Sequence, residues 1–321
     1  MIASKTFDIR LSNRWSRPRR TRESMPAPLE RPAPLERYVR SERDRVDGWL
    51  ARVDAEIFRV LMQTQASKGL AGGAAEIGVH HGKSFICLCL ALAHDEKAYC
   101  IDVFEDQKEN LDGSGKGDRE KFEENLKAFG VPAEQVVTRQ ASSLNVVAQD
   151  IVGAVGPVRF FSIDGGHWQE IVENDLSLAE HALAPHGVIA LDDFHRSDWP
   201  DVSAGYFRWR QRRTRPFAPI AIGFNKLFIC DPEFAPLYQA ALGEDPFLSK
   251  LVVRPVGFEG KLVPVFRPPI LPEASLTDHL AALLRVARPE WFIAVKDALV
   301  PLKDLGRRHL RPLLGKRRPS F

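Results

Sequence analysis

Between residues 70 and 232 the sequence alternates short apolar runs with longer amphipathic segments. Each apolar run is long enough for one buried strand, and the amphipathic segments repeat their apolar residues with the period of a helix. Strands that alternate with helices at this spacing are typical of a parallel sheet with helices on both faces. Five strands are predicted, and they end near residues 78, 102, 140, 164 and 192.

The end of this pattern departs from strict alternation. The segment PIAIGFNKLFICD at 219–231 predicts two strands separated by Gly-Phe-Asn, which would end the sheet as an antiparallel hairpin. Residues 233–306 contain amphipathic helices and short strands. We therefore expect a doubly wound, mostly parallel Rossmann-like sheet with a terminal antiparallel hairpin over 46–232, followed by a C-terminal α/β appendage over 233–306.

Charge is unevenly distributed along the 321 residues. Residues 1–45 carry 12 Lys and Arg against 6 acids, and residues 307–321 carry 6 Lys and Arg and no acid. The hexapeptide PAPLER occurs twice in succession, at 26–31 and 32–37, and its prolines oppose a helix. We expect a disordered basic Pro/Arg-rich arm over 1–45 and a basic tail over 307–321. Such tails favour weak contact with anionic surfaces rather than specific binding of nucleic acid.

Cysteine usage and hydropathy bear on the compartment. The four cysteines lie in apolar segments without the paired spacing of a zinc site, which indicates buried thiols in a reducing environment. No apolar run approaches the roughly 20 residues that span a bilayer. The arginines near the N-terminus are not followed by the apolar segment of an export signal. We expect a cytoplasmic protein.

The candidate chemistry lies at the ends of the predicted strands. In an open parallel sheet, ligands bind beyond the carboxyl ends of the strands. FFSIDGGHW at 160–168 and VIALDDFH at 188–195 both run from an apolar strand directly into aspartate, which indicates one shared site. We call the edge of the sheet at the carboxyl ends of the parallel strands the rim. The residues expected on the rim are Gly78, Asp102, Ser142, Ser143, Asp164, Asp192 and Asp193.

The turn after the first strand argues against a dinucleotide or ATP. EIGVHHG at 76–82 has G-x-x-x-G spacing instead of G-x-G-x-x-G, and Glu76 puts a negative charge near the expected phosphate position. Asp102 ends the second strand, where a carboxylate can accept hydrogen bonds from both hydroxyls of a ribose. A ligand with an adenine, a ribose and a cationic tail fits this pattern, and S-adenosylmethionine is such a ligand.

With these motifs, residues 70–231 resemble class I S-adenosylmethionine-dependent methyltransferases. The IDGGHW and LDDFH blocks resemble the metal-dependent O-methyltransferases that act on macrolide and aminocoumarin sugars and their relatives. The resemblance implies that Glu76, Gly78 and Asp102 bind the cofactor. Ser142 and Ser143 follow the third strand on the same rim and are further candidates for cofactor binding.

The same resemblance implies that Asp164, Asp192 and Asp193 hold the metal and that His167 is the base. Asp164 and His167 are therefore the catalytic candidates. Electrostatics agrees, because three carboxylates that converge without Lys or Arg partners would raise one another's pKa, a cost that a divalent cation removes. All-oxygen ligands suit Mg²⁺. A hydroxyl on the metal becomes more acidic, and His167 can take its proton as the oxygen attacks the methyl group.

The expected function is Mg²⁺-dependent O-methylation of a hydroxyl on a small molecule or glycan, by a chain that can also form a homo-oligomer. Two other classes stay open. D-x-x-H with another acid or histidine could bind iron or zinc for oxidation or hydrolysis on the same fold. A non-catalytic protein could instead use its basic tails on nucleic acid or an anionic membrane.

Two further segments lie outside these motifs. Residues 106–118 are polar and Gly-rich and predict a mobile loop. Trp199, Tyr206, Trp209 and the RWRQRRTR run at 208–215 could clamp an acidic or sugar substrate, although a charge run is usually a solvated face.

Overall fold

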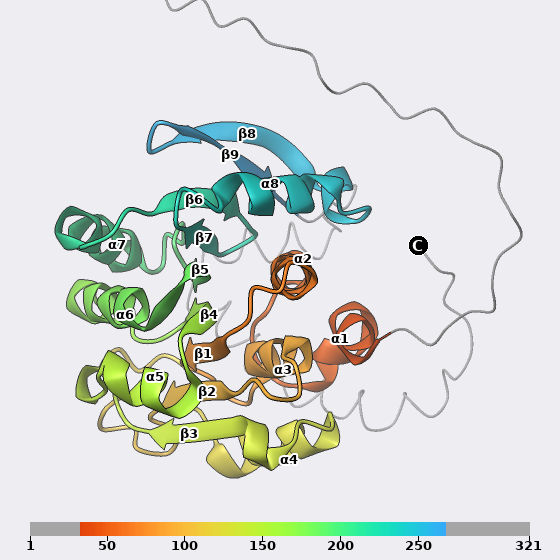
Figure 1. Cartoon of the computed structure of the whole chain (residues 1–321). Helices are drawn as coiled ribbons and strands as arrows, with labels where there is room; N and C mark the ends of the chain where they lie inside the picture. The colour runs from red at the N-terminus through yellow and green to blue at the C-terminus, as the bar shows by residue number, and fades with distance from the viewer. Residues whose placement is uncertain (1–32, 268–321) are drawn as a thin grey trace, which may run out of the picture.

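The computed structural model describes residues 33–267 (Figure 1). The part of the expected arm up to residue 32, the part of the expected appendage beyond residue 267 and the expected basic tail lie outside the described residues.

A nine-stranded sheet forms the centre of this part of the chain, in the order β3-β2-β1-β4-β5-β7-β6-β9-β8. Neighbouring strands from β3 to β5 are parallel, and β7 is antiparallel to both β5 and β6. The doubly wound, mostly parallel fold and its antiparallel hairpin are thus confirmed. The strands of this fold are β1 (Gly73–Ile77), β2 (Ala98–Asp102), β3 (Val136–Gln140), β4 (Val158–Ile163), β5 (Leu183–Leu191), β6 (Ala218–Ile222) and β7 (Leu227–Cys230).

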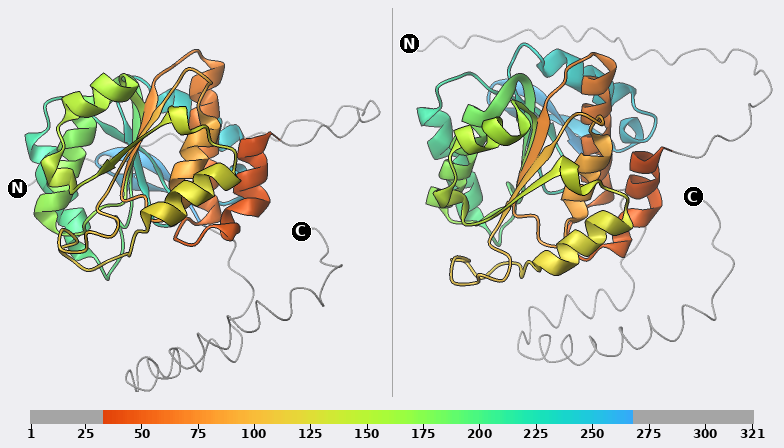
Figure 2. Two further views of the ribbon diagram at one scale, coloured as in Figure 1. Left: turned by 90° about the horizontal axis from the view of Figure 1, so that it is seen from below. Right: turned by 60° about the horizontal axis from the view of Figure 1, so that its bottom comes forward.

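Helices cover both faces of the sheet (Figure 2). One face packs against α2 (Arg52–Ser67), α3 (Lys83–Ala91) and α4 (Arg119–Ala128), whose buried side chains share one apolar cluster. The other face packs against α5 (Ala148–Val155), α6 (Gln169–Ala182) and α7 (Pro200–Arg212), which share a second cluster. Within residues 33–267 no helix has the length and apolarity to cross a membrane.

The expected disorder up to residue 45 is wrong for the last part of that segment. Residues 34–45 form α1 (Pro34–Arg37), a π-helical turn (Tyr38–Glu42) and a 3₁₀ turn (Arg43–Arg45). Leu35, Tyr38 and Val39 are buried, and the Tyr38 hydroxyl donates to the carbonyl of Lys83 at 2.7 Å. The second PAPLER copy can begin a helix because proline is compatible with the first helical positions, where no N–H is needed. Leu35, Tyr38 and Val39 then lie on one face of the helical segment and form a buried apolar stripe.

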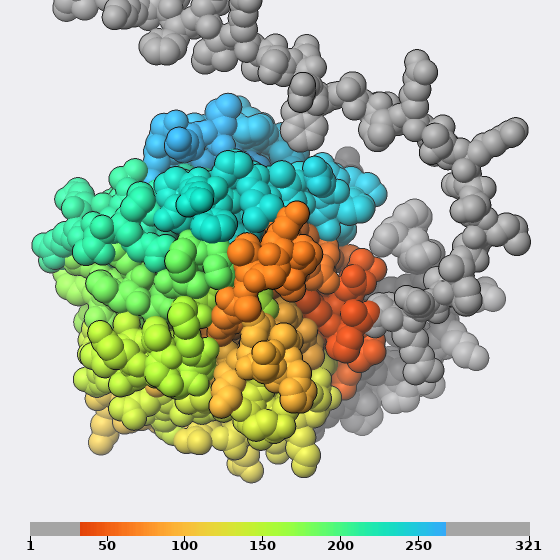
Figure 3. All heavy atoms as spheres, in the orientation of Figure 1, coloured from red at the N-terminus to blue at the C-terminus, as the bar shows by residue number. Residues whose placement is uncertain are grey.

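The expected separate appendage is also wrong for residues 233–267, because they extend the same sheet. They form α8 (Ala235–Glu244), a 3₁₀ turn (Leu248–Lys250), β8 (Val252–Phe258) and β9 (Lys261–Phe266). β9 pairs in parallel with β6, and β8 lies outside it as the last strand. Arg59 on α2 donates to Asp245 at 2.6 Å, which ties the end of α8 to the helical layer. Figure 3 shows these segments as a continuous surface with the rest of the described chain.

Candidate active site

A cavity of about 400 Å³ opens at the carboxyl ends of the parallel strands, where the strand order reverses between β1 and β4. This switch point is where open α/β sheets bind their ligands. Loops that follow five strands, together with the turn between β6 and β7, line the cavity. Its lining includes the predicted residues Gly78, Asp102, Ser142, Ser143, Asp164, His167, Asp192 and Asp193.

Gly78 allows the loop after β1 to lie directly against the loop after β4. Its φ is +80°, and a Cβ at this position would lie 1.8 Å from the carbonyl oxygen of Asp164. A side chain there would both strain the backbone and displace Asp164. The glycine therefore sets how closely the β1 loop approaches the acidic end of β4.

The structure does not bring Glu76 to the cavity. Successive strand residues point to opposite faces, so Ile77 lines the cavity while Glu76 points into the helical layer. The Glu76 carboxylate is fully buried and accepts a hydrogen bond from the Ser162 hydroxyl at 2.9 Å. Burial raises the pKa of Glu76 to about 7. Glu76 therefore interacts with residues inside the protein and does not line the cavity.

Asp102 lies at the cavity wall and also shapes the loops around it. One carboxylate oxygen accepts from the backbone N–H of His80 at 2.8 Å, and the other accepts from the N–H of Phe104 at 2.6 Å. Burial raises the pKa of Asp102. Each carboxylate oxygen retains a second lone pair, so the side chain can accept further hydrogen bonds from a ligand.

Ser142 and Ser143 enter the cavity wall from the loop after β3. Ser142 is the N-cap of a 3₁₀ turn (Ser143–Asn145), and its hydroxyl accepts from the N–H of Leu144 at 3.4 Å. Ser143 is buried within that turn. Both lie beside the cavity, at the end of the sheet that contains Asp102.

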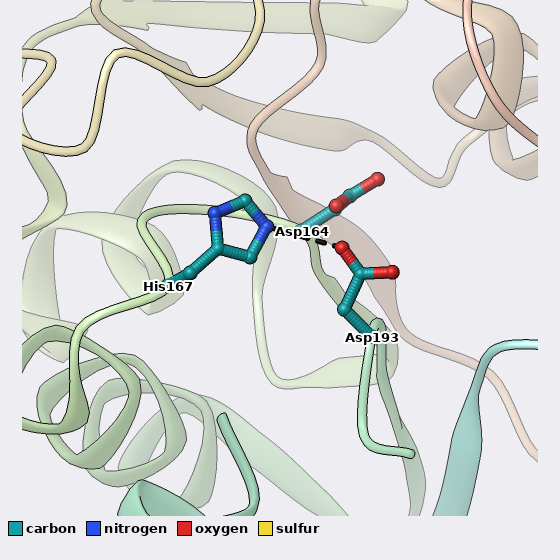
Figure 4. Close-up of side chains that lie close together, drawn as sticks. All are labelled: Asp164, His167 and Asp193. Carbon is teal, nitrogen blue, oxygen red and sulfur yellow. Dashed lines mark hydrogen bonds and ion pairs between the residues drawn. The ribbon is translucent and has the colours of Figure 1, made fainter. Parts of the chain in front are cut away.

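The two predicted acidic tips converge on His167 (Figure 4). One possible ligand atom from each of Asp164, His167 and Asp193 lies within 4.8 Å of the other two. The Nε2 atom of His167 lies 3.1 Å from a carboxylate oxygen of Asp193. Asp193 reaches this position because β5 has already ended at Leu191 and Asp193 adopts a left-handed conformation with φ 55°.

The expectation that the carboxylates converge without a basic partner is wrong. Lys226 is 2% exposed, and its Nζ atom lies 2.6 Å from Asp192 and 3.9 Å from Asp164. Burial lowers the pKa of Lys226, but the charges of Asp192 and Asp164 outweigh it and raise that pKa above its ordinary value. Asp192 therefore already has a cationic partner.

Asn225 precedes this lysine in the β6–β7 turn and was also missed by sequence reasoning. Its side-chain amide donates to Asp192 at 3.1 Å and makes a second, short hydrogen bond to Asp193. Buried Asp54 on α2 accepts from the N–H of Phe224 at 2.9 Å and holds the turn in place. The turn thus supplies an amide and an ammonium group to the acidic end of β5.

The charge on Asp164 is less well compensated than the charge on Asp192. Desolvation by the surrounding protein, followed by the nearby charge of Asp192, raises the pKa of Asp164 well above its usual range. For Asp193, desolvation is outweighed by hydrogen bonds from His167 and Asn225, so its pKa is lowered. An ionised Asp164 is therefore costly in this position, and the Nζ atom of Lys226 lies 3.9 Å from it against 2.6 Å from Asp192.

His167 also contacts Asp112, which belongs to the loop at 106–118. The Asp112 carboxylate accepts from the backbone N–H of His167 at 2.6 Å and lies 2.8 Å from its Nδ1 atom. Desolvation lowers the pKa of His167, but the hydrogen bonds with Asp112 and Asp193 outweigh it and raise that pKa to about 9. The loop that we expected to be mobile thus makes defined contacts with the rim.

The aromatic and basic residues of 199–215 separate into two groups. Trp199 lines the cavity and stacks on the His167 ring, with centroids 4.0 Å apart and planes at 12°. Tyr206 and Trp209 are buried in the apolar core instead. Arg208 and Arg212 on α7 pair with Glu173 on α6 at 2.8 and 2.7 Å. These two arginines therefore join α7 to α6, and no residue of the run at 208–215 lines the cavity.

One family of known proteins matches the part of the chain that contains most residues of this rim. Residues 75–194 match the model of a methyltransferase domain family, which confirms the resemblance to methyltransferases over that segment. A search of curated proteins finds no match to this chain.

Several solved structures are similar to the chain at low sequence identity. The O-methyltransferase NovP is 16% identical, with 55% of this chain and 78% of NovP covered and a TM-score of 0.47. A putative O-methyltransferase from Klebsiella pneumoniae is 16% identical, with 63% and 90% covered and a TM-score of 0.43. The O-methyltransferase TomG from Streptomyces achromogenes, solved in complex with SAM, is 18% identical, with 62% and 89% covered and a TM-score of 0.40.

Proposed function

We propose that this protein transfers the methyl group of S-adenosylmethionine to a hydroxyl oxygen of a small molecule or glycan, a proposal supported by the match of residues 75–194 to a methyltransferase domain model. The observation that carries the proposal is the convergence of Asp164, His167 and Asp193 on the cavity that Gly78 and Asp102 also line. The cofactor would lie between the loops that follow β1, β2 and β3, with its sulfonium facing the acidic rim.

In this reaction His167 is the base. The acceptor oxygen attacks the methyl carbon, the carbon–sulfur bond breaks with its electron pair on sulfur, and S-adenosylhomocysteine leaves. The hydroxyl proton moves to the Nε2 atom of His167. A positioned base of this kind contributes roughly 10²- to 10⁴-fold to a rate. The remaining requirement is an in-line arrangement of oxygen, methyl carbon and sulfur, which the bound substrates would have to adopt in the cavity.

We also propose that Asp164 and Asp193 hold a divalent cation, with Mg²⁺ the best match to carboxylate ligands. The residues fit such an ion, because one possible ligand atom from each lies within 4.8 Å of the others, and desolvation followed by the charge of Asp192 makes an ionised Asp164 costly, a cost that a cation would offset. A bound divalent cation lowers the pKa of the acceptor hydroxyl. A cation held by Asp193 would compete with Nε2 of His167 for the carboxylate, and the weaker contact would leave the imidazole better able to accept a proton.

Asp192, the third predicted metal ligand, has a different role in this proposal. Its carboxylate oxygens contact Nζ of Lys226 and the side-chain amide of Asn225. Removing it from that pair would leave a buried ammonium group without its nearest counter-ion, which is costly. We therefore assign Asp192 to holding Lys226 and Asn225 beside the rim, with Asp164 and Asp193 as the direct ligands.

We expect S-adenosylhomocysteine to raise the melting temperature of the purified chain. A ligand that binds only the folded state stabilises it by about 2.7 kcal/mol at a concentration 100 times its Kd. The measurement is a thermal shift assay with S-adenosylhomocysteine, NAD and ATP in parallel, each with and without Mg²⁺. A shift with NAD or ATP and none with S-adenosylhomocysteine would overturn the assignment of the cofactor.

Replacing Asp102 by alanine is expected to weaken binding of S-adenosylmethionine by about 1–3 kcal/mol, because ribose hydroxyls lose a charged acceptor. Isothermal calorimetry measures this change directly. Since Asp102 also accepts from two backbone N–H groups, the Asp102→Asn variant is the companion test: its amide oxygen can still accept. Unchanged affinity in Asp102→Ala would show that the ribose is held elsewhere.

A metal-dependent oxidase or hydrolase is the second candidate, because two carboxylates and one imidazole within 4.8 Å could also bind iron or zinc. Metal analysis of the purified chain separates the two functions. Tightly bound iron or zinc together with no response to S-adenosylhomocysteine would favour the second candidate.

The remaining sequence-based expectations are a cytoplasmic location, a homo-oligomer and contact of the basic tails with anionic surfaces. Support for a reducing compartment comes from Cys87, Cys89, Cys100 and Cys230, which are free and buried. Burial raises the pKa of each of these thiols, so they are poor nucleophiles.

A further inference from the structure

Asp112 is an acid that sequence reasoning placed in a mobile loop, yet its side chain is only 2% exposed. Its carboxylate contacts Ser114 on one oxygen and His167 on the other. One oxygen accepts from the N–H of Ser114 at 2.8 Å and from the Ser114 hydroxyl at 2.5 Å. The other accepts from the backbone N–H of His167 at 2.6 Å and lies 2.8 Å from Nδ1 of the same residue.

These contacts determine which nitrogen of His167 faces the reaction. An ionised carboxylate only accepts hydrogen bonds, so Nδ1 must carry a proton toward Asp112. Nε2 then points to Asp193, on the side of the ring where Asp164 also lies. Trp199 stacks on the imidazole with ring centroids 4.0 Å apart, which opposes rotation of the ring about its Cβ–Cγ bond and leaves two stacked orientations related by a flip. The contact between Nδ1 and Asp112 selects one of these two orientations.

The loop itself holds Asp112 ready for this contact. The side-chain amide of Asn110 donates to the carbonyl of Ser114 at 2.7 Å and to that of Gly115 at 3.2 Å, which closes the loop on itself. Asn110, Leu111 and Ser114 also line the cavity. The position of the loop over the cavity and the orientation of His167 are therefore set by the same carboxylate.

We propose that Asp112 is a positioning residue for His167, and that the loop at 106–118 orients the base by docking onto it. The inference rests on the proposed role of His167 as the base. An outer partner that orients a functional histidine typically changes activity 10- to 100-fold when it is removed. Asp112 itself contacts no reacting atom in this scheme. Its effect on the reaction runs through the direction of Nε2.

The test is proton and nitrogen NMR of the ¹⁵N-labelled full chain, recorded with and without Mg²⁺ and without any acceptor. We expect one downfield proton bonded to Nδ1 of His167, slow to exchange with water because the carboxylate holds it. The signal is identified by its absence in His167→Gln. It should disappear in Asp112→Ala and remain in Asp106→Ala, which removes the same charge from an exposed residue of the same loop.

Asp112→Asn is the second variant, in case alanine unfolds the loop. Its one carbonyl oxygen can accept from either Ser114 or His167 but not from both sides, so a weakened and faster-exchanging signal is expected. An unchanged His167 signal in both folded Asp112 variants would overturn the proposal. This readout does not depend on methyl transfer. If S-adenosylhomocysteine fails to bind while the signal behaves as expected, the proposed function fails and the orientation of His167 by Asp112 stands.

Discussion

Replacing His167 by alanine is expected to lower the rate of methyl transfer by roughly a hundredfold or more, while the binding of S-adenosylhomocysteine and of Mg²⁺ persists. Asp164→Ala is expected to remove activity together with its dependence on Mg²⁺, because one of the two proposed ligands is lost. The two variants differ because only Asp164 would touch the cation. Steady-state kinetics, calorimetry and melting temperature on the same preparations make the comparison.

The matched control is His195→Ala, which removes an exposed imidazole three residues beyond Asp192. It should retain full turnover. A folded His167→Ala protein with wild-type turnover would exclude His167 as the base. If turnover falls only in proportion to the folded fraction, the role of His167 is structural. Such a role would fit its position directly before Trp168, the N-cap of α6.

Replacing Lys226 by methionine is expected to lower the free energy of unfolding by about 3–5 kcal/mol, the usual cost of leaving one member of a buried ion pair alone. Lys226 is almost fully buried, and three acids near it, Asp192, Asp164 and Asp54, would lose their cation together. Urea unfolding measures the loss. Lys68→Met, the same substitution at an exposed residue after α2, should stay within about 0.5 kcal/mol of the wild type.

The effect of Mg²⁺ on the stability of the Lys226→Met variant gives a second test. Without the lysine, Asp192 is free to take part in holding the divalent cation, so Mg²⁺ should raise the stability of Lys226→Met more than that of the wild type. A variant that is as stable as the wild type would show that the pair contributes little. Equal stabilisation of both proteins by Mg²⁺ would show that Asp192 does not join the cation in the variant, and no response in either protein would argue against a cation at Asp164 and Asp193.

The sequence predicted the parts of the rim that follow directly from strand ends. An apolar run that stops at an acid marks both the strand and the side of the sheet on which the acid lies, and this brought together Asp102, Asp164 and Asp193. The exception is Glu76, which precedes the end of its strand by one residue. The alternation of side chains along β1 sends it to the opposite face from Ile77.

Lys226 and Asn225 could not be assigned from strand ends because they lie in the turn of the hairpin. Register provides the missing information: Leu191 pairs with Leu227 across antiparallel β5 and β7, so the residues just beyond that pair, Asp192 and Lys226, come together. Sequence periodicity does not give the register between strands that are not adjacent in the chain. Asp112 was missed for a different reason, since nothing distinguishes it from the other polar residues of its loop.

The outermost strand, β8, exposes a row of backbone groups at the edge of the described part of the sheet. Such edges can pair with strands of other molecules and lead to aggregation. β8 contains Pro255, which has no N–H to donate, and beside it Arg254, an exposed charge. These two residues interrupt the pattern that an incoming strand would need. Within the described residues, Arg254 and Pro255 are thus features of the β8 edge that oppose edge-to-edge association.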